Sequence, residues 1–367
     1  MGLRTSEKAS VLRHGRDRSH NFRLKIQRKH TMMCSDTVLI HIEHVWSDSM
    51  KKSSFLDTGL GVFSAAILAN LLWGSASPCI KLGYRLFQIS SDAVMSQIFF
   101  AGIRFTLAGL LTVVLGSLME HRALLPRKGS AGMLLALAFT QTIAQYTFFY
   151  MGLSKAPGYK GSVISPSSVF FAVLLASLVL HQEKLTVRKL FGCVVGFAGV
   201  ILVSLQSSGD AGGFRWDGEG FLLLAAFSYA CSTVLIKRFS QLENPVTLSG
   251  WQFIIGGSVM AAVSFLAGGR LRPLSPQAWL LMLYLGLLSA VAYTLWSLLL
   301  QRHPVSHITV YSFANPVFGV ILSALLLGEG KNLDVPRCLL SLLLVSLGVW
   351  IVNGGQKEKE VKSGEAA

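Results

Sequence analysis

Long apolar segments are the feature that most constrains this chain. Each is close to the ~20 residues with which an α-helix crosses ~30 Å of hydrocarbon. Because lipid offers no hydrogen-bonding partners, only helices or closed barrels can span it. These runs are apolar on every face, whereas barrel strands alternate, so we expect an all-α integral membrane protein. The sequence predicts ten transmembrane helices, at about 60–80, 94–118, 130–153, 161–180, 188–206, 219–238, 247–267, 278–301, 305–327 and 334–353.

The composition agrees with a lipid environment and argues against nucleic-acid binding. Hydrophobic residues make up 52% of the chain and charged residues 14%, well below the ~25% charged residues of a soluble domain. The net charge of +15 does not indicate nucleic acid, because the lysines and arginines of a membrane protein gather in cytoplasmic loops and tails. We therefore expect the lipid bilayer and a small-molecule metabolite as partners, a homodimer as one conceivable assembly, and no nucleic acid.

The sequence carries no pattern for catalysis, nucleotide binding or metal coordination. Its five cysteines are scattered, and none forms a CxxC or Cys/His cluster. It contains no P-loop, zinc-protease or serine-hydrolase motif. We expect no catalytic residues, no metal and no cofactor. Transport by such a chain must draw on an ion gradient or on the gradient of the substrate itself.

Residues 1–49 differ from the rest of the chain. They are rich in lysine and arginine and contain no apolar stretch long enough for a signal-peptide core. Met50-Lys51-Lys52 then reads like the ordinary start of an inner-membrane protein. We hypothesise that Met50 is the initiator and that 1–49 is a basic extension, either not translated or disordered. The rival is a basic cytoplasmic tail that touches anionic lipid.

The charges outside the spans indicate an orientation. An even number of crossings places both termini on one side of the membrane. Lysines flank the first and last spans, at Lys51 and Lys52 and again at Lys357 and Lys359, which argues that this side is cytoplasmic. We therefore expect a multi-pass protein of the cell inner membrane with both termini in the cytoplasm.

An internal repeat organises the spans into two halves. Ile80-Lys81 in the first span matches Ile236-Lys237 in the sixth, and Tyr146-Thr147 in the third matches Tyr293-Thr294 in the eighth. Further matches are Pro157 with Pro304, Glu183 with Glu329 and Gly199-Val200 with Gly348-Val349. The expected domains are a first repeat of five helices at 55–206, a linker at 207–218, a second repeat of five helices at 219–353 and a charged tail at 354–367.

Because five is an odd number, the second repeat enters the bilayer upside down relative to the first. Two inverted repeats can exchange conformations about a central site, which is the basis of alternating access. A plain anchor or structural protein has no need of that symmetry. The repeat therefore favours a transporter over other classes of membrane protein.

Several residues together carry a resemblance to a known family. They are Trp73-Gly74, Arg104, Pro157 and Pro304, Glu183 and Glu329, and the Gly192, Gly196 and Gly199 series. Over about residues 60–353 the chain resembles the EamA family of the drug/metabolite transporter superfamily. The resemblance implies a ten-helix secondary carrier with its substrate in a central cavity, many members of the family exporting amino acids or related metabolites. This chain departs from the repeat where Tyr229-Ala230 replaces Trp-Gly and where Val259 falls near the position of Arg104, so we expect the two halves to contribute unequally.

Polar residues within spans are costly and are therefore the first functional candidates. Arg104, well inside the second span, could meet a substrate carboxylate; the alternative is an arginine tied to carbonyl groups for packing. Gln141, Gln145 and Tyr146 lie on the third helix, where 141 and 145 are one turn apart and should share a face. Hydrogen bonding between helices is the alternative for both amides. Tyr293 and Trp296 occupy the matching eighth helix.

Prolines suggest breaks in three helices. Pro78, Pro166 and Pro316 each remove a backbone donor and free a carbonyl, and broken helices near the midplane are where such carriers bind solutes. Ordinary kinks are the alternative. The full set of predicted substrate-binding residues is Trp73, Ser77, Arg104, Gln141, Gln145, Tyr146, Ser165, Tyr229, Tyr293, Trp296 and Asn315.

Two acidic residues end spans in matching places. For Glu183 and Glu329 we expect a structural role, because an acid in the turn before a helix can accept from the free amides of that helix; proton coupling is the alternative. The sequence thus predicts an EamA-type secondary transporter that exports amino acids or related small metabolites. The alternatives are a carrier of sugar nucleotides or other organic anions and, from another class, a non-transporting membrane sensor.

Overall fold

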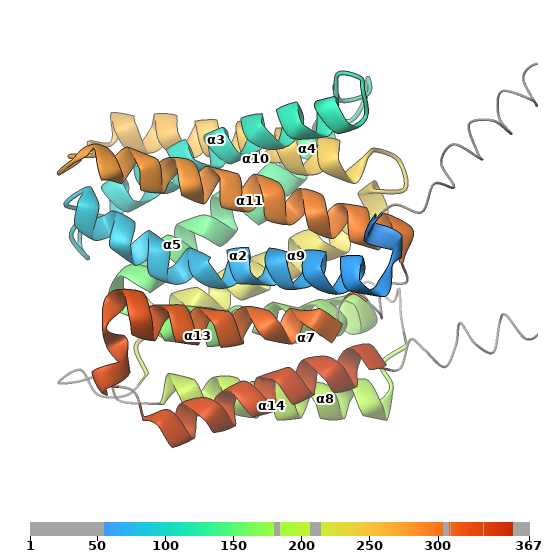
Figure 1. Cartoon of the computed structure of the whole chain (residues 1–367), viewed down its shortest axis with the longest axis vertical. Coiled ribbons are helices and arrows are strands. Elements are labelled where there is room, and N and C mark those ends of the chain that lie inside the picture. The colour runs from blue at the N-terminus through green and yellow to red at the C-terminus, as the bar shows by residue number, and fades with distance from the viewer. Residues whose placement is uncertain are drawn as a thin grey trace, which may run out of the picture. The chain divides into compact units, whose positions relative to one another are not determined.

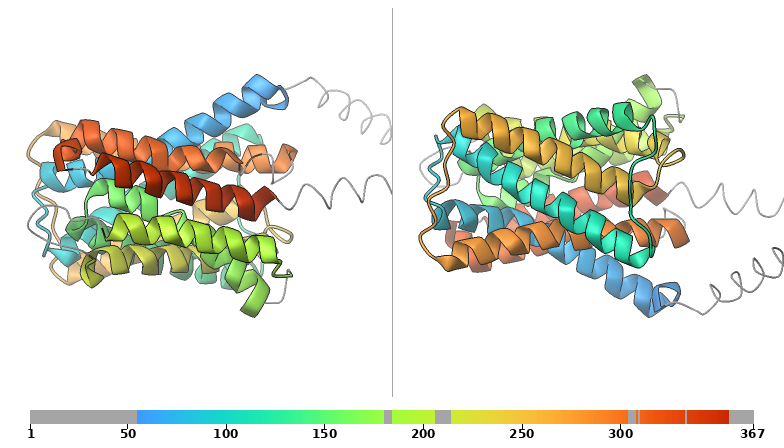
Figure 2. Two further views of the ribbon diagram at one scale, coloured as in Figure 1. Left: turned by 90° about the horizontal axis from the view of Figure 1, so that it is seen from below. Right: turned by 90° about the horizontal axis from the view of Figure 1, so that it is seen from above.

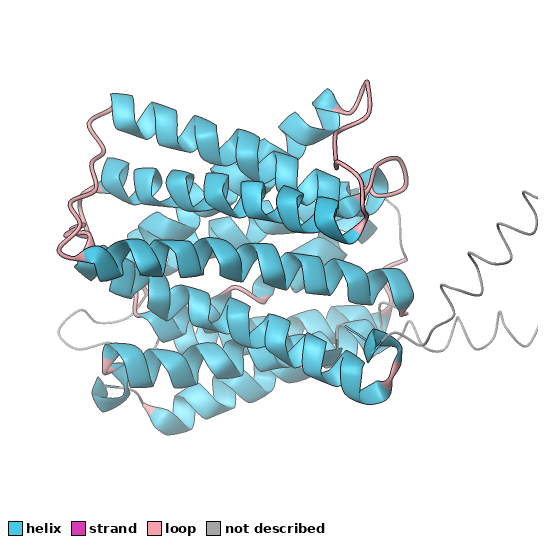
Figure 3. Cartoon of the chain, turned by 45° about the horizontal axis from the view of Figure 1, so that its top comes forward, coloured by secondary structure: helices cyan, strands magenta, loops and turns pink. Residues whose placement is uncertain are grey.

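The computed structural model describes residues 55–179, 184–205, 214–303, 308, 310–332 and 334–354. The chain divides into two units, 1–58 and 59–367. Of the first unit, the structure describes the short helix η1 (Phe55–Asp57) and the residue after it. The predictions for 1–49, Glu183 and Pro304 fall outside the described residues. The described part of the second unit consists of helices and connecting loops and contains no strand (Figure 3), which confirms the all-α prediction.

The second unit is a bundle of long helices lying side by side (Figure 1). Its first half contains α2 (Gly59–Leu86), α3 (Val94–Met119), α4 (Ala131–Leu137), η2 (Ala138–Ala144), α5 (Gln145–Lys155), α6 (Gly158–Ile164), α7 (Ser167–Leu174), η3 (Leu175–Val179) and α8 (Val187–Ser204). Its second half contains η4 (Trp216–Gly220), α9 (Phe221–Phe239), α10 (Pro245–Leu266), α11 (Pro276–Arg302), η5 (Val310–Phe313), α13 (Ala314–Leu327), η6 (Glu329–Asn332) and α14 (Val335–Gly354).

Eight helices in the described part of the chain are long and apolar enough to cross a membrane, and the chain is a multi-pass membrane protein. Two of the ten predicted segments are not among the eight. The segment expected at 130–153 is the run α4–η2–α5, whose middle carries Thr140, Gln141, Thr142 and Gln145. The segment expected at 305–327 contributes a shorter apolar helix, Tyr311–Leu327.

Glycines allow helices from the two halves to pack closely. A Cβ atom on Gly74 of α2 would lie 2.8 Å from the Asn315 carbonyl oxygen near the start of α13. One on Gly348 of α14 would lie 2.6 Å from the Cα atom of Gly196 on α8. Both pairs of helices are among the most extensively packed in the molecule, as are α3 and α10. Figure 2 shows α8 beside α14 on one side of the bundle and α3 crossing α10 on the opposite side.

Two of the three prolines coincide with interruptions in the helices. The chain breaks between α6 and α7 at Ser165-Pro166, and 3-10 helix η5 gives way to α13 just before Asn315-Pro316. Pro78 instead lies inside the uninterrupted helix α2. The break at Ser165-Pro166 and the change of helix type before Asn315-Pro316 each have a polar residue beside the proline.

Candidate functional site: a central cavity

A cavity of about 450 Å³ lies within the second unit and is lined by both halves of the chain. In the first half of the sequence its walls come from α2, α3, α5, α7 and the break before α7. In the second half they come from α9, α11, α13 and α14. The lining extends to Thr233 and Lys237, which are exposed near the end of α9, and to Asn353 near the end of α14. The cavity therefore reaches one end of the bundle.

Arg104 is the buried cation in the cavity wall. Its side chain is 3% exposed and is held by three neutral groups. Nε–H donates to the Leu285 carbonyl oxygen at 3.3 Å, an Nη1–H donates to the Tyr150 hydroxyl at 2.7 Å, and an Nη2–H donates to the Ser289 hydroxyl at 3.1 Å. These bonds use three of the five N–H groups of a guanidinium. Within the described residues no acidic side chain forms an ion pair with Arg104.

Aromatic rings form much of the remaining wall. The Trp73 ring meets the Tyr293 ring at 5.5 Å and the Trp296 ring at 5.2 Å between centroids, both edge to face. Tyr146 stacks on Phe105 at 3.8 Å. These rings come from α2, α3, α5 and α11, and Tyr229 adds one from α9. Such a wall offers flat apolar surface with polar hydroxyl groups at its edges.

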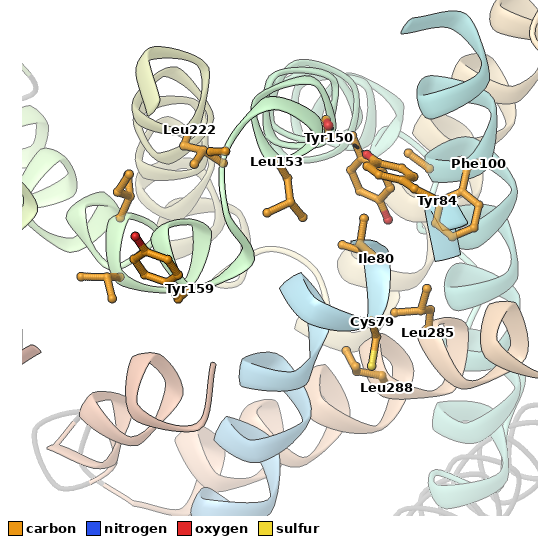
Figure 4. Close-up of a cluster of buried hydrophobic side chains, with 14 of the residues drawn as sticks. Cys79, Ile80, Tyr84, Phe100, Tyr150, Leu153, Tyr159, Leu222, Leu285 and Leu288 are labelled. Carbon is orange, nitrogen blue, oxygen red and sulfur yellow. Dashed lines mark hydrogen bonds between the residues drawn. The ribbon is translucent and has the colours of Figure 1, made fainter. Parts of the chain in front are cut away.

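Tight packing closes the bundle beyond the inner end of the cavity. Ile80 and Leu222, which line the cavity, belong to a cluster of buried side chains that includes Tyr84, Tyr150 and Leu153 (Figure 4). The Tyr84 hydroxyl donates to the Tyr150 carbonyl oxygen at 2.9 Å. This cluster fills the space between α2, α5 and α9, so the cavity does not continue through it.

An ion pair between the two halves lies beside this cluster. Lys81 Nζ of α2 is 3.4 Å from Glu329 Oε1 and donates to the Ala156 carbonyl oxygen at 2.8 Å. The same carboxylate accepts from the backbone N–H groups of Gly158 and Tyr159, at 3.0 and 3.3 Å. We expected Glu329 to serve the helix that follows it. It instead caps α6, a helix of the other half, because left-handed Gly328 (φ 70°) turns the chain back toward α6.

A second ion pair at this end is fully buried. Lys160 Nζ of α6 is 2.7 Å from Glu219 Oε1 in η4, and both side chains are at most 3% exposed. Lys160 also donates to the Ser204 carbonyl oxygen at 3.3 Å, and Glu219 accepts from the Arg215 backbone N–H at 3.0 Å. The pair joins the start of the fourth predicted span to the start of the sixth.

Nine of the eleven residues predicted from the sequence lie together in the cavity wall. The two exceptions are Ser77, which is buried on α2 against Gly161 of α6, and Gln141, which is wholly buried in η2. These nine are the candidate substrate-binding residues of the cavity. They are Trp73, Arg104, Gln145, Tyr146, Ser165, Tyr229, Tyr293, Trp296 and Asn315.

Several residues of the site were missing from the prediction, although helical spacing pointed to some of them. Tyr150, which accepts from Arg104, lies four residues after Tyr146. Ser289 lies four residues before Tyr293, and both line the cavity. Asn70 precedes Trp73 by one turn and keeps its side-chain oxygen without a hydrogen-bond partner among the described residues. Residues one turn apart share a helix face, so each could have been found from its predicted neighbour.

A match to a protein family shows to which family the chain belongs. The EamA-like transporter family matches the chain over residues 60–205 and again over 216–354. The chain belongs to the EamA-like transporter family. The two matched stretches contain the residues of both cavity walls, so the cavity lies within the family's own fold.

Several curated proteins resemble this EamA-like chain along most of its length. A chloroplastic WAT1-related protein of Arabidopsis thaliana is 28% identical over 292 residues, which cover 76% of this chain and 67% of that protein. A probable amino-acid metabolite efflux pump of Escherichia coli is 26% identical over 311 residues, covering 82% and 97%. Its namesake in Salmonella typhimurium is 26% identical over 275 residues, covering 72% and 86%.

A solved crystal structure supports the fold. It aligns with a TM-score of 0.54 at 18% identity and covers 80% of this chain and 96% of its own. At that level of identity the similarity concerns the arrangement of the helices alone. This EamA-like chain is thus a membrane protein of a transporter family, with a central cavity that both halves build.

Proposed function

We propose that this chain is a secondary transporter that exports amino acids or related small metabolites by alternating access. The observation that carries the proposal is the cavity itself. It is lined by both halves of the chain, reaches one end of the bundle, and stops at packed side chains and two ion pairs near the other end. Exchange of the open and closed ends would carry a solute across the bilayer.

We further propose that the architecture is ten crossings in two inverted repeats, 55–206 and 219–353. The pattern of helix packing supports this proposal. In the first half α2 packs on α13 and α11; the matching helix of the second half, α9, packs on α7 and α5, the counterparts of α13 and α11. The two most extensively packed pairs, α3 with α10 and α8 with α14, each join counterparts. A two-fold relation between halves produces this pattern.

The direction and setting follow from the relatives and from the charges. Two relatives carry the name amino-acid metabolite efflux pump, which favours export and a bacterial inner membrane. The lysines that flank the first and last spans favour a cytoplasmic position for both termini. The cavity reaches the end of the bundle at which α2 starts. Export would then begin at this end.

A carrier of sugar nucleotides or other organic anions is the second candidate. Arg104 favours it, because the described residues of the cavity wall include Arg104 and Lys237 as charged groups and none that is acidic. A membrane sensor that does not transport would need a domain to pass a signal on. The described loops between the helices are short.

Counterflow in proteoliposomes tests the proposal. Purified protein is reconstituted and offered pooled radiolabelled amino acids, nucleobases and organic anions. Uptake against a preloaded pool is expected for one class, and Arg104→Ala is expected to abolish it. Arg122→Ala, in an exposed pair with Glu120, is the matched control and should transport like the wild type. Absence of counterflow for every pool, with folded protein, would contradict the proposal.

A further inference from the structure

We propose that the cavity selects a net anion, namely a monocarboxylate with a flat ring, over a zwitterionic amino acid. This inference rests on the proposed transport function: of the amino acids and related metabolites proposed there, it favours related acids that lack an ammonium group. Three features carry it: a buried arginine with neutral partners, a cavity wall without an acidic group among its described residues, and a set of aromatic rings around the arginine.

The charge of Arg104 is the first feature. A guanidinium stays protonated in proteins, so the cavity wall holds a permanent positive charge. A buried charge without an ionic partner is costly within a membrane. Tyr150, Ser289 and the Leu285 carbonyl group supply dipoles but no negative charge. An entering carboxylate would supply that charge and could accept from the two remaining N–H groups, as guanidinium–carboxylate pairs do.

The absence of an acidic side chain from the described cavity wall is the second feature. An amino acid carries its ammonium group on the carbon next to its carboxylate. If the carboxylate binds Arg104, the ammonium lies within a few ångströms of the same guanidinium and is repelled by it. The described wall offers no aspartate or glutamate to offset that repulsion, only neutral groups such as Asn70 and Asn315. A carboxylate without an ammonium avoids the repulsion.

The rings are the third feature. Trp73, Tyr293 and Trp296 form a contiguous aromatic surface, and Tyr146, stacked on Phe105, adjoins Tyr293. Tyr146 and Tyr293 both lie close enough to Arg104 to interact electrostatically with it. A flat ring can stack on or meet these rings edge to face, which is the preferred geometry of aromatic pairs. A solute whose ring is a few bonds from its carboxylate would use both parts of the wall.

The number of cationic side chains in the cavity wall favours a monocarboxylate over a sugar nucleotide. A nucleotide diphosphate carries two or more negative charges close together. Among the described lining residues, the second cation besides Arg104 is Lys237, which is exposed at the mouth of the cavity. One buried guanidinium matches a single carboxylate. Of the organic anions, the wall therefore favours a monocarboxylate.

Binding of matched compounds to the full chain in lipid nanodiscs tests the inference. The set is 3-phenylpropanoate, phenylalanine, 3-phenylpropanamide and 3-cyclohexylpropanoate, measured by quenching of tryptophan fluorescence at neutral pH. Trp73 and Trp296 line the cavity and report occupancy. We expect 3-phenylpropanoate to bind at least about ten-fold more tightly than phenylalanine or the amide, because each of these loses charge complementarity with Arg104. The cyclohexyl acid should bind more weakly than the phenyl acid.

Two variants remove or neutralise the unpaired positive charge of Arg104 in different ways. Arg104→Gln deletes the cation, and Ser289→Asp places a carboxylate beside the Nη2 group that now donates to Ser289. Each should abolish the preference for 3-phenylpropanoate, whereas Arg122→Gln on the exposed surface should leave it unchanged. The second route retains the arginine, so the test survives misfolding of the first variant.

The outcomes separate this inference from the proposed function. Phenylalanine binding as tightly as 3-phenylpropanoate, or no binding of the acid while amino acids show counterflow, would overturn the inference and leave the transport proposal standing. Failure of counterflow for every pool would overturn both. Retention of the acid preference in folded Ser289→Asp protein would show that Arg104 is not its source.

Discussion

The buried charges of this protein fall into two kinds. Lys160 and Glu219 neutralise each other, and each has a further backbone partner. Arg104 has neutral partners, and its charge faces the cavity. Charges buried in pairs join helices, whereas a buried charge left for an incoming group is the kind that serves binding. The two positions should therefore respond differently to substitution.

Glu219→Gln should destabilise the protein strongly, by about 3–5 kcal/mol, because it leaves the Lys160 ammonium buried without a counter-charge. The measurement is the unfolding midpoint in detergent. Lys160→Met combined with Glu219→Leu should recover much of the loss, since the charge and its partner leave together. The exposed pair of Arg215 and Asp217 provides the control, and Asp217→Asn should leave the midpoint close to wild type. Equal effects of the Glu219 and Asp217 substitutions would contradict the assignment.

At the scale of elements, the start of α6 depends on a contact from the other half. The first turn of a helix has free N–H groups, and those of Gly158 and Tyr159 donate to Glu329. Lys81 of α2 adds an ion pair to the same carboxylate. A single side chain thus joins α2, α6 and the loop after α13 at the closed end.

Glu329→Gln should loosen this junction. The amide lacks the charge that pairs with Lys81 and offers one oxygen where the carboxylate offers two. We expect faster hydrogen exchange in the peptide that covers 158–164, measured by mass spectrometry on protein in nanodiscs. Asp334→Asn, which alters the exposed pair with Arg337 at the start of α14, should leave that peptide unchanged. Unaltered exchange in the Glu329 variant would show that α6 is held by other contacts.

The stability contributed by the contacts of Glu243 with Arg127 and Ser130 should depend on pH. Burial disfavours the charged form of Glu243, but hydrogen bonds from the Arg127 backbone N–H, the Ser130 hydroxyl and the Asn244 backbone N–H outweigh it, so the pKa of Glu243 lies below its ordinary value. The carboxylate therefore stabilises the fold fully above the ordinary glutamate pKa of about 4.3. That contribution is lost as the pH falls through the lower pKa of the folded protein.

The unfolding midpoint measured from pH 7 down to pH 3 tests this. The wild type should lose stability over the acidic part of the range, and Glu243→Gln should be less stable at pH 7 but show a smaller loss on acidification. Parallel curves for the two proteins would contradict the role of Glu243.

One element shows why part of the site escaped prediction. Gln141 and Gln145 are four residues apart, so ordinary helical spacing places both on one face. The structure has a π-helix at Ala138–Ala144, in which hydrogen bonds span five residues and each turn is wider. Gln145 lines the cavity, whereas Gln141 is buried beside Tyr293. Apolar segments carry no signal for such a local widening, because packing against neighbouring helices decides it.

The sequence also did not reveal which charged side chains pair with each other. Glu329 pairs with Lys81 across 248 positions of sequence (329 minus 81), and no local pattern joins the two. The helical structure followed from the need for internal hydrogen bonds in lipid. The repeat pointed to Tyr146 and Tyr293, and the family resemblance pointed to Trp73. Contacts between distant side chains depend on how the helices pack, and they required the structure.

At the scale of the whole bundle, the proposed transport function requires that solute pass through the cavity between the two halves. The polar residues at the two helix interruptions, Ser165 and Asn315, both line that cavity. A group attached at either position would occupy the route, whereas one on the outer face of α14 would lie in lipid. Leu343 on α14 is 67% exposed and provides the outer control.

Thiol modification during counterflow tests this claim most directly. Single cysteines are introduced as Ser165→Cys, Asn315→Cys and Leu343→Cys in a background whose native cysteines are replaced, and each is labelled with a bulky thiol reagent. We predict that labelling at 165 or 315 abolishes counterflow of the transported solute and that labelling at 343 leaves it intact. Undiminished counterflow after complete labelling at 165 and 315 would show that the solute does not pass through this cavity.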